Sequence, residues 1–277
     1  MTAPILVMGA TGKVGGAVAR MLTATGRDVR APVRHPRPGS GTVEGDFDRP
    51  ATIEPHATGA RTAFILGGRR DLPGLVDTLE RAGVEHVVLL TSRSVIGGVA
   101  GNAIVDMWTA SEDAVRASRL GWTVLRPSGF MSNALRWLPQ LAAGDVVRVT
   151  FPDAPIAAIH EDDLAAVAVA ALVDPDRYRA MALELSGPES LVPADQLAIL
   201  GRALGRSLRL EPVVGDAARS ELAATFPPAF VDAQIRFFEH GEFDDGRVVP
   251  TVREILDRPA LTFAQWVASN RARFVTG

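Results

Sequence analysis

The chain has 277 residues, with 29 Lys and Arg against 32 Asp and Glu and a formal net charge of -3. This length suits one large core, or a core with a smaller appended lobe. The near balance of charge, without long basic runs, argues against a nucleic-acid partner and against binding to an anionic membrane. Because the sequence contains no cysteine, a disulfide, a thiolate nucleophile and a Cys-ligated metal are excluded.

Neither a metal site nor a membrane segment is expected. The five histidines lack the spacing of metal ligands. No stretch approaches the ~20 apolar residues that span a bilayer, and strand-like residues begin at position 5 without an apolar signal segment before them. We therefore expect a cytoplasmic protein that acts on a small molecule. The oligomeric state is open, with a homodimer as one option.

Strand-like and helix-like segments alternate through the first half of the chain. The expected strands are residues 5–8, 28–33, 42–44, 62–66, 86–90 and 123–125, and the expected helices include 16–22, 72–82 and 103–119. This alternation predicts an α/β fold, a Rossmann-type doubly wound parallel sheet with helices on both faces. Ligands of such sheets bind beyond the carboxyl ends of the strands.

The alternation loosens after residue 130. Strand-like pieces lie at 146–150, 156–159 and 182–185, a helix is expected at 162–172, and helical segments including 230–238 then dominate to the end. We expect a dinucleotide-binding domain over residues 1–150, with returning segments at about 160–186 and 245–257. A smaller, mostly helical substrate lobe would cover 187–245, followed by a C-terminal helix at 258–277.

The first expected strand runs directly into the turn Gly9-Ala10-Thr11-Gly12-Lys13-Val14-Gly15. Gly9 permits a tight strand-to-helix turn, Gly12 lets backbone amides approach a pyrophosphate, and Gly15 lets the helix pack close to the strand. Because strand, glycines and helix start follow in the required order, the sequence predicts a dinucleotide site here.

The second expected strand ends in Arg34, and no Asp or Glu follows it to hold a ribose with free hydroxyls. A guanidinium forms a bidentate, charge-assisted pair with a 2′-phosphate. We therefore predict NADP(H) as the cofactor in preference to NAD(H).

With these motifs in place, the chain resembles the atypical short-chain dehydrogenase/reductase superfamily and, within it, the NmrA-like group. The matching motifs span nearly the whole chain: the turn at 9–15, Val33-Arg34-His35-Pro36, Gly45-Asp46-Phe47-Asp48, Leu90-Thr91-Ser92, Trp122-Thr123-Val124-Leu125-Arg126-Pro127, Ile159-His160-Glu161-Asp162-Asp163-Leu164-Ala165, Ser186-Gly187-Pro188-Glu189 and Thr262-Phe263-Ala264-Gln265-Trp266.

The resemblance implies roles for individual residues. It gives the pyrophosphate and nearby ribose to the turn, Gly9, Ala10, Thr11, Gly12, Lys13, Val14 and Gly15. The 2′-phosphate falls to Arg34 and the adenine edge to Asp46 and Phe47. Leu66, Gly67, Gly68, Thr91 and Ser92 would line the path to the nicotinamide, with Pro127, Ser128, Gly129 and Phe130 beside its ring. His160 and Asp163 would belong to a structural helix start with Asp162 as its cap.

The chain departs from the superfamily in its catalytic residues. Typical members carry Tyr-x-x-x-Lys, in which the lysine lowers the tyrosine pKa for proton transfer. Here the only tyrosine is Tyr178, and the only lysine is Lys13 in the turn. Ser92 and Asp106 are the catalytic candidates that this leaves, whereas Glu112 is interpreted as structural. The candidate substrate pocket comprises Ser94, Trp108, Phe130, Asn133 and Phe230.

The leading hypothesis is an NADPH-dependent oxidoreductase that reduces an apolar aromatic, quinone or conjugated carbonyl substrate. Such acceptors delocalise charge and need little help from an acid, so a missing tyrosine is tolerable. Apolar side chains, most of them aromatic, would form the pocket: Phe130, Met131, Trp137, Phe226, Phe230, Phe237 and Phe238. The alternatives are a non-catalytic NADP(H)-sensing regulator and, more weakly, an isomerase or dehydratase.

Overall fold

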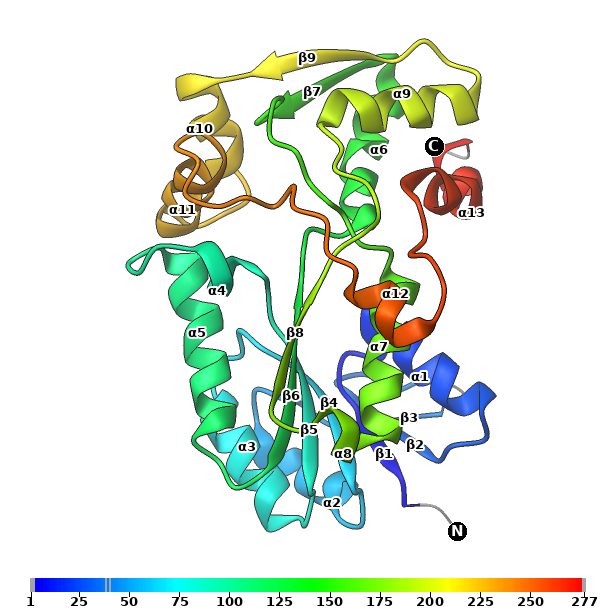
Figure 1. Cartoon of the computed structure of the whole chain (residues 1–277), viewed down its shortest axis with the longest axis vertical. Helices are drawn as coiled ribbons and strands as arrows, with labels where there is room; N and C mark the ends of the chain where they lie inside the picture. Colours follow the sequence, from blue (N-terminus) through cyan, green and yellow to red (C-terminus); the bar gives the residue numbers. More distant parts are fainter. Residues whose placement is uncertain (1–2, 38, 40, 276–277) are drawn as a thin grey trace. The chain divides into compact units, whose positions relative to one another are not determined.

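The computed structural model, shown in Figure 1, describes residues 3–37, 39 and 41–275. The chain divides into two compact units. The first comprises Met1–Ser92, Met107–Pro127 and Glu161–Glu184, and the second comprises Arg93–Asp106, Ser128–His160 and Leu185–Gly277. Residues 93–106, 128–150 and 245–257, which were expected to belong to the dinucleotide domain, thus lie with the second unit. Segment 128–150 does so because its strand and helices pack on C-terminal elements instead of the large sheet.

Within the described residues, one sheet of seven strands has the order β3-β2-β1-β4-β5-β6-β8. The strands are β1 (Ile5–Val7), β2 (Val29–Val33), β3 (Thr42–Glu44), β4 (Thr62–Leu66), β5 (His86–Leu90), β6 (Gly121–Pro127) and β8 (Met181–Leu185). All pairings among β1 to β6 are parallel. The chain proceeds outward from β1 to β3, then returns at β4 on the other side of β1. The doubly wound prediction is confirmed, and the order reverses beside β1.

Helices cover both faces of this sheet. Leu6, Ala63 and Val87 alternate with residues of the opposite face and pack into a buried cluster with α3 (Leu72–Arg81) and with Val115 of α5 (Ala103–Arg116). On the other side, α1 (Lys13–Ala24) and α7 (Glu161–Val173) lie side by side (Figure 1). Short helices complete the first unit: η1 (Pro50–Thr52), α2 (Glu54–Ala57) and α8 (Pro175–Tyr178).

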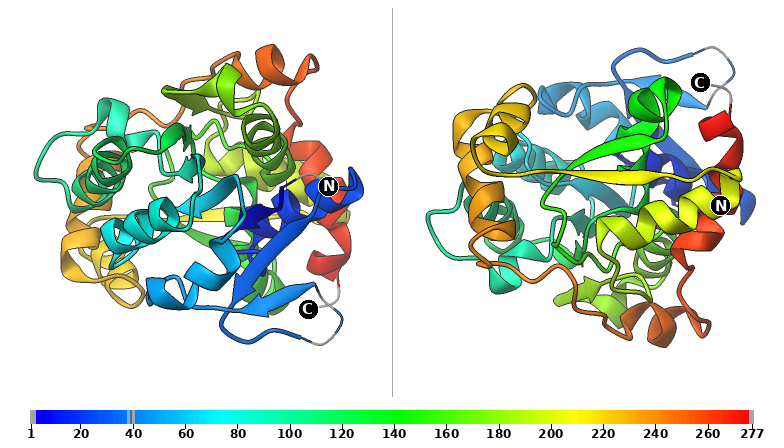
Figure 2. Two further views of the ribbon diagram at one scale, coloured as in Figure 1. Left: turned by 90° about the horizontal axis from the view of Figure 1, so that it is seen from below. Right: turned by 90° about the horizontal axis from the view of Figure 1, so that it is seen from above.

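The second unit is built around a short parallel pair, β7 (Val146–Thr150) and β9 (Arg209–Val213). Its core contains Trp137, Trp266 and Phe263, and the rings of Phe263 and Trp266 stack at 5.6 Å between centroids. Figure 2 (right) shows β9 beside α9. The helices are α4 (Ser94–Gly97), η2 (Met131–Trp137), α6 (Leu138–Ala143), α9 (Pro193–Leu204), α10 (Gly215–Ala223), α11 (Pro228–Phe238), α12 (Thr251–Leu256) and α13 (Phe263–Val275).

Most expected elements are present with bounds shifted by up to three residues, and two differences bear on particular residues. Residues 156–159 form no strand of their own, because only isolated bridges connect Ile156 with Leu191 and Ile159 with Phe130. The predicted helix at 162–172 begins one residue earlier, at Glu161. Asp162 therefore lies in the first helical turn and does not cap the helix, and its Oδ1 accepts a hydrogen bond from Nη2 of Arg20 at 3.1 Å.

Candidate functional site

The turn between β1 and α1 has the backbone that the glycines predicted. Gly9 adopts φ +68, in the left-handed region that favours glycine. A side chain at Gly15 would collide with the carbonyl oxygens of Met8 and Gly9, so the helix can approach the strand only with glycine there. At Gly12 a Cβ would lie 3.2 Å from the Gly9 oxygen. The tight turn and the close packing of α1 are both confirmed.

The N-terminus of α1 suits an anionic ligand. Its capping residue, Gly12, provides no side-chain hydrogen bond, and the first turn contains no acidic residue. Thr11, Gly12 and Lys13 are exposed. First-turn amides without intrahelical partners, together with the positive end of the helix dipole, favour phosphate. The residues present therefore fit the pyrophosphate of a dinucleotide.

Arg34 and Asp46 follow neighbouring strands, β2 and β3. Arg34 is exposed, and its charge acts on Asp46. A hydrogen bond from the Asp48 amide, 3.1 Å from Oδ1, and the nearby Arg49 and Arg34 lower the pKa of the Asp46 carboxyl. Asp46 thus closes its own turn as an ionised carboxylate, and the charge of Arg34 also acts on it.

Gly67 and Gly68 follow β4 and pack closely on α5. A Cβ at Gly67 would lie 3.1 Å from the ring of Trp108, and Gly68, at φ +69, donates its N–H to Ser111 Oγ at 2.9 Å. Leu66 packs against Gly9, because a Cβ built on Gly9 would lie 2.8 Å from Leu66 Cδ1. Residues expected along the cofactor path are therefore brought together at the carboxyl ends of β1 and β4.

Thr91, the residue directly after β5, belongs to a buried polar network. Its hydroxyl donates to Glu112 Oε1 at 3.0 Å, and Arg126 donates to the same carboxylate through both Nε and Nη2. Arg116 adds a third cationic contact at 2.7 Å. Burial raises the pKa of Glu112, but the two guanidinium groups more than offset it and leave the pKa below its usual value. Glu112 is a structural ion-pair centre, as the sequence analysis interpreted it.

The catalytic candidates lie in different surroundings. Ser92 is half-buried directly after Thr91. Asp106 is exposed near the start of α5, and its Oδ1 accepts the N–H of Gly101 at 3.1 Å. Of the substrate-pocket candidates, Ser94 is buried and Asn133 is exposed. The carboxylate of Asp106 is therefore engaged in closing its own loop.

The aromatic side chains of the second unit divide into two groups. Trp137 is 1% exposed and Phe237 is 3% exposed, so both are core residues. Phe130, Phe230 and Phe238 are half-buried, and these three have ring surface available to a ligand. Met131 is buried and Phe226 is exposed.

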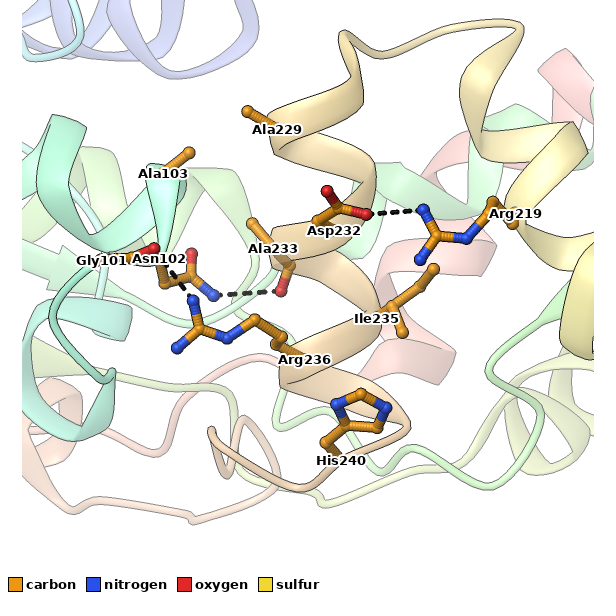
Figure 3. Close-up of a pocket in the computed structure, with 10 residues that line it drawn as sticks. All are labelled: Gly101, Asn102, Ala103, Arg219, Ala229, Asp232, Ala233, Ile235, Arg236 and His240. Carbon is orange, nitrogen blue, oxygen red and sulfur yellow. Dashed lines mark hydrogen bonds and ion pairs between the residues drawn. The ribbon is translucent and has the colours of Figure 1, made fainter.

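A surface cavity of about 450 Å³ in the second unit lies between α11 and the loop that follows α4 (Figure 3). Its charges are matched internally, since Arg219 pairs with Asp232 at 2.5 Å. Arg236 donates to the Gly101 oxygen at 2.9 Å, and Asn102 donates to the Ala233 oxygen at 3.1 Å. These two hydrogen bonds connect the loop that follows α4 to α11.

Asp245, a residue that was not among the expected site residues, lies against Gly129. The Asp245 carboxyl is 7% exposed, and its Oδ2 accepts the Gly129 N–H at 3.0 Å. No periodic pattern marks Asp245, because it lies in an irregular segment between α11 and α12 and meets Gly129 across 116 positions of sequence. A buried carboxyl is exceptional, and only the structure reveals this burial.

The fold and the glycine turn together define a Rossmann-type dinucleotide-binding protein. The chain belongs to the NAD(P)H-binding family, whose model matches residues 9–175. NADP(H), the cofactor expected from Arg34, fits this site. Among the described residues, no helix is both long and apolar enough to cross a membrane.

A curated relative and two solved structures match almost the whole chain. The (4-alkanoyl-5-oxo-2,5-dihydrofuran-3-yl)methyl phosphate reductase of Streptomyces griseus subsp. griseus is 37% identical over 280 residues, covering 98% of this chain and 99% of that protein. The Escherichia coli NADPH-dependent quinone oxidoreductase QOR2, complexed with NADPH, has a TM-score of 0.80 at 20% identity, covering 96% of this chain and 99% of that one. NmrA, a negative transcriptional regulator in complex with NAD, has a TM-score of 0.75 at 19% identity and covers 96% of this chain and 94% of its own. The expected likeness to NmrA-type and quinone-oxidoreductase-type proteins is confirmed.

Proposed function

We propose that the protein is an NADPH-dependent reductase of conjugated carbonyl compounds, acting on a carbon–carbon double bond next to a carbonyl. The observation that carries this proposal is the likeness to the Streptomyces griseus reductase, at 37% identity over 98% of the chain. It combines with a glycine turn whose geometry suits a dinucleotide.

The substrate named for that relative explains why a proton-donating tyrosine could be dispensable. In a 4-alkanoyl-5-oxo-2,5-dihydrofuran, the ring double bond is conjugated with both the lactone carbonyl and the alkanoyl carbonyl. Negative charge formed on reduction is therefore spread over two carbonyl groups, and stabilising it requires less from the protein. The absence here of Tyr-x-x-x-Lys is compatible with such an acceptor.

Residues of the first unit would hold the cofactor. Backbone amides at the start of α1 would face the pyrophosphate, and Arg34 would pair with the 2′-phosphate. The reduced nicotinamide supplies a hydride when it is bound. Ser92, after β5, is the side chain we favour for orienting the substrate carbonyl, whereas the loop contact of Asp106 disfavours that residue. The half-buried rings of Phe130 and Phe230 would offer apolar surface to the substrate.

The test is a panel of acceptors mixed with the purified protein and NADPH, with products identified by mass. The panel contains a 4-acyl-5-oxo-2,5-dihydrofuran with and without its phosphate, a simple cyclic enone, a quinone and an unconjugated ketone. We expect consumption of NADPH with the conjugated acceptors and a mass gain of two hydrogens in the product. Turnover of the unconjugated ketone alone, or of none, would contradict the proposal.

A second candidate is a non-catalytic sensor of NADP(H). The fold likeness to NmrA and the missing Tyr/Lys pair favour it. A sensor would bind the nucleotides and turn over no member of the panel, and a partner would be captured in a nucleotide-dependent way. An isomerase would instead convert its substrate without net consumption of cofactor.

A further inference from the structure

The cavity of Figure 3 lies wholly within the second unit, since the residues that line it belong to the segments 93–106 and 185–277. Its volume of about 450 Å³ is within the range of cavities that bind small molecules. One wall is a face of α11, and the others are Arg219 of α10 and residues 101–103 at the start of α5. The cavity is therefore a candidate ligand site that needs no residue of the first unit.

Part of the lining is apolar. Ala229, Ala233 and Ile235 of α11 contribute to it, together with Ala103 of α5. Ala229 and Ala233 are about one helical turn apart, so their methyl groups lie on the same side of α11. Three of these four side chains are single methyl groups, which leave room beside the helix. A ligand that fills this part of the cavity has an apolar body.

Arg219 presents an unoccupied hydrogen-bonding edge at the same cavity. Its Nη1 donates to Asp232 Oδ1 at 2.5 Å. Within the described residues, Nε and Nη2 of Arg219 have no hydrogen-bond partner. These two N–H groups form the fork that binds both oxygens of a carboxylate or phosphate group. Arg219 can therefore bind an anion without giving up its contact with Asp232.

Two further donors line the cavity. Arg236 donates through Nε to Glu242 Oε1 at 2.9 Å and through Nη1 to the Gly101 oxygen at 2.9 Å, whereas its Nη2 has no partner in the part of the chain that the structure describes. The ring of His240, just beyond the end of α11, is exposed. In the view of Figure 3, Arg219 and Arg236 lie on two sides of Ile235. Donors thus border the apolar surface on more than one side.

The charges of the lining favour an anion over a cation. Among the lining residues that the structure describes, Asp232 is the one acid, against two arginines. Glu242, outside the lining, offsets part of the Arg236 charge. An ammonium ligand has to compete with Arg219 for Asp232, whereas an anion can use the fork of Arg219 beside the existing pair. The cavity therefore discriminates by the sign of the ligand's charge.

We propose that this cavity binds a small organic anion. Its carboxylate or phosphate group accepts hydrogen bonds from Nε and Nη2 of Arg219, and its apolar body packs on the alanine methyl groups and Ile235. The bound ligand connects α10 to α11 and to the residues at the start of α5. This site is additional to the dinucleotide site of the first unit, and it does not depend on the proposed reductase activity.

The first test is calorimetric titration of the full chain with four probes that share one alkyl group: hexyl phosphate, hexanoate, hexan-1-ol and hexylammonium. The protein is saturated with NADP+, which keeps the anions away from the dinucleotide site. We expect both anions to bind with a Kd at least about tenfold below those of the alcohol and the ammonium ion. Equal affinity for hexylammonium, or no binding of either anion at millimolar concentrations, would overturn the proposal.

The second test changes the two charges of the pair. Arg219→Gln removes the fork and should raise the Kd for the anions about tenfold. Asp232→Asn should lower this Kd several-fold, because it removes a negative charge beside the ligand and releases Nη1 of Arg219. A damaged fold can weaken binding but not strengthen it, so the gain in Asp232→Asn distinguishes a direct contact from a loss of structure.

The matched controls are Arg253→Gln and Asp195→Asn. Both replace exposed residues of the same unit that lie outside the lining, and both should leave the Kd unchanged. An affinity for hexyl phosphate that neither Arg219→Gln nor Asp232→Asn alters would mean that the anion binds elsewhere.

NMR of protein labelled with ¹³C in its alanine methyl groups locates the ligand. Hexyl phosphate should shift the signals of Ala229 and Ala233 and leave that of Ala63, buried in β4 of the first unit, in place. Saturable binding without shifts at Ala229 and Ala233 would overturn the proposal. Because these measurements involve no turnover, a failure of the reductase proposal would leave their outcome unaffected.

Discussion

At the scale of single residues, the guanidinium of Arg34 is expected to determine which dinucleotide the first unit prefers. Replacing Arg34 by Ala removes a hydrogen-bonded charge pair worth about 1.5–3 kcal/mol, so the Kd for NADPH and NADP+ should rise roughly 10- to 100-fold. The Kd for NADH and NAD+ should change little. Calorimetric titration of both proteins with each of the four nucleotides measures these changes in Kd.

The control for this measurement is Arg61→Ala. Arg61 is also exposed, but it lies just before the amino end of β4, whereas the turn follows the carboxyl end of β1, and it pairs with Glu85. It should bind all four nucleotides as the unmodified protein does. An equal loss for the phosphorylated and unphosphorylated pairs in Arg34→Ala would mean that Arg34 does not contact the 2′-phosphate.

His86 gives the folded protein a particular dependence on pH. It is fully buried at the start of β5, and its Nε2 lies 2.9 Å from the Thr123 hydroxyl. Because that hydroxyl donates its hydrogen to the Tyr178 oxygen, Nε2 must carry the proton and Nδ1 is the bare nitrogen. Burial, with help from the Arg179 charge, lowers the pKa of His86 to about 4.

The sign of the effect follows from linkage. Between about pH 6.5, the usual pKa of histidine, and about pH 4, the unfolded chain binds a proton at His86 that the folded chain excludes. The free energy of unfolding should therefore fall as the pH drops through this window. In His86→Gln the fall between about pH 7.5 and about pH 5 should be smaller, as measured by urea unfolding. His240 is exposed, so His240→Gln should show the same fall in the free energy of unfolding as the unmodified protein. The same fall in His86→Gln would contradict this assignment.

At the scale of elements, Glu112 joins α5 to the ends of β5 and β6. It is fully buried and receives hydrogen bonds from Thr91, Arg116 and Arg126. Replacing it by Gln leaves two guanidinium groups without their anion. Breaking a buried pair in this way costs about 3–5 kcal/mol.

Urea unfolding of Glu112→Gln and Asp113→Asn measures this cost. Asp113 is the adjacent, largely exposed carboxylate, with only a 3.9 Å contact to Arg116. Its replacement should change the free energy of unfolding by no more than about 0.5 kcal/mol. Equal effects of the two substitutions would contradict a structural role for the buried network.

The elements that sequence could predict are those with a regular pattern. The buried strands β4 and β5 are continuous apolar runs, and their predicted bounds match the structure. Strand β9 was missed because Arg209–Val213 is mostly exposed and contains Pro212, which sequence rules assign to turns or edges. Residues 156–159 read as a strand by composition, yet they make only single bridges to distant segments.

The same distinction between local pattern and tertiary contact separates the predictable and unpredictable residues of the candidate site. The turn at 9–15 was predictable because the required backbone geometry restricts the residue type, as the collision at Gly15 shows. The burial of Asp245 was not predictable, because Asp245 contacts Gly129 and Ala157, two residues that are far from it in the sequence. The pKa of an aspartate becomes unusual only through the tertiary structure that surrounds the side chain.

At the scale of the whole molecule, the chain passes between its two units several times. The second unit takes the segments 93–106, 128–160 and 185–277, and the first takes the segments between them. The three passages from the first unit to the second come just after β5, at the end of β6, and between the last two residues of β8. The connections from the first unit to the second thus begin at or near strand ends of the large sheet.

The most direct test of the reductase proposal is to locate the transferred hydrogen. Reduction of a 4-acyl-5-oxo-2,5-dihydrofuran is run with NADPH that carries deuterium at either face of its C4 position, and the product is examined by NMR and mass spectrometry. We predict one deuterium, from one of the two labelled cofactors, at the ring carbon β to both carbonyl groups, with one NADPH consumed per product. Product without deuterium from either cofactor, or no product while NADPH still binds, would contradict the account and favour an isomerase or a sensor, respectively.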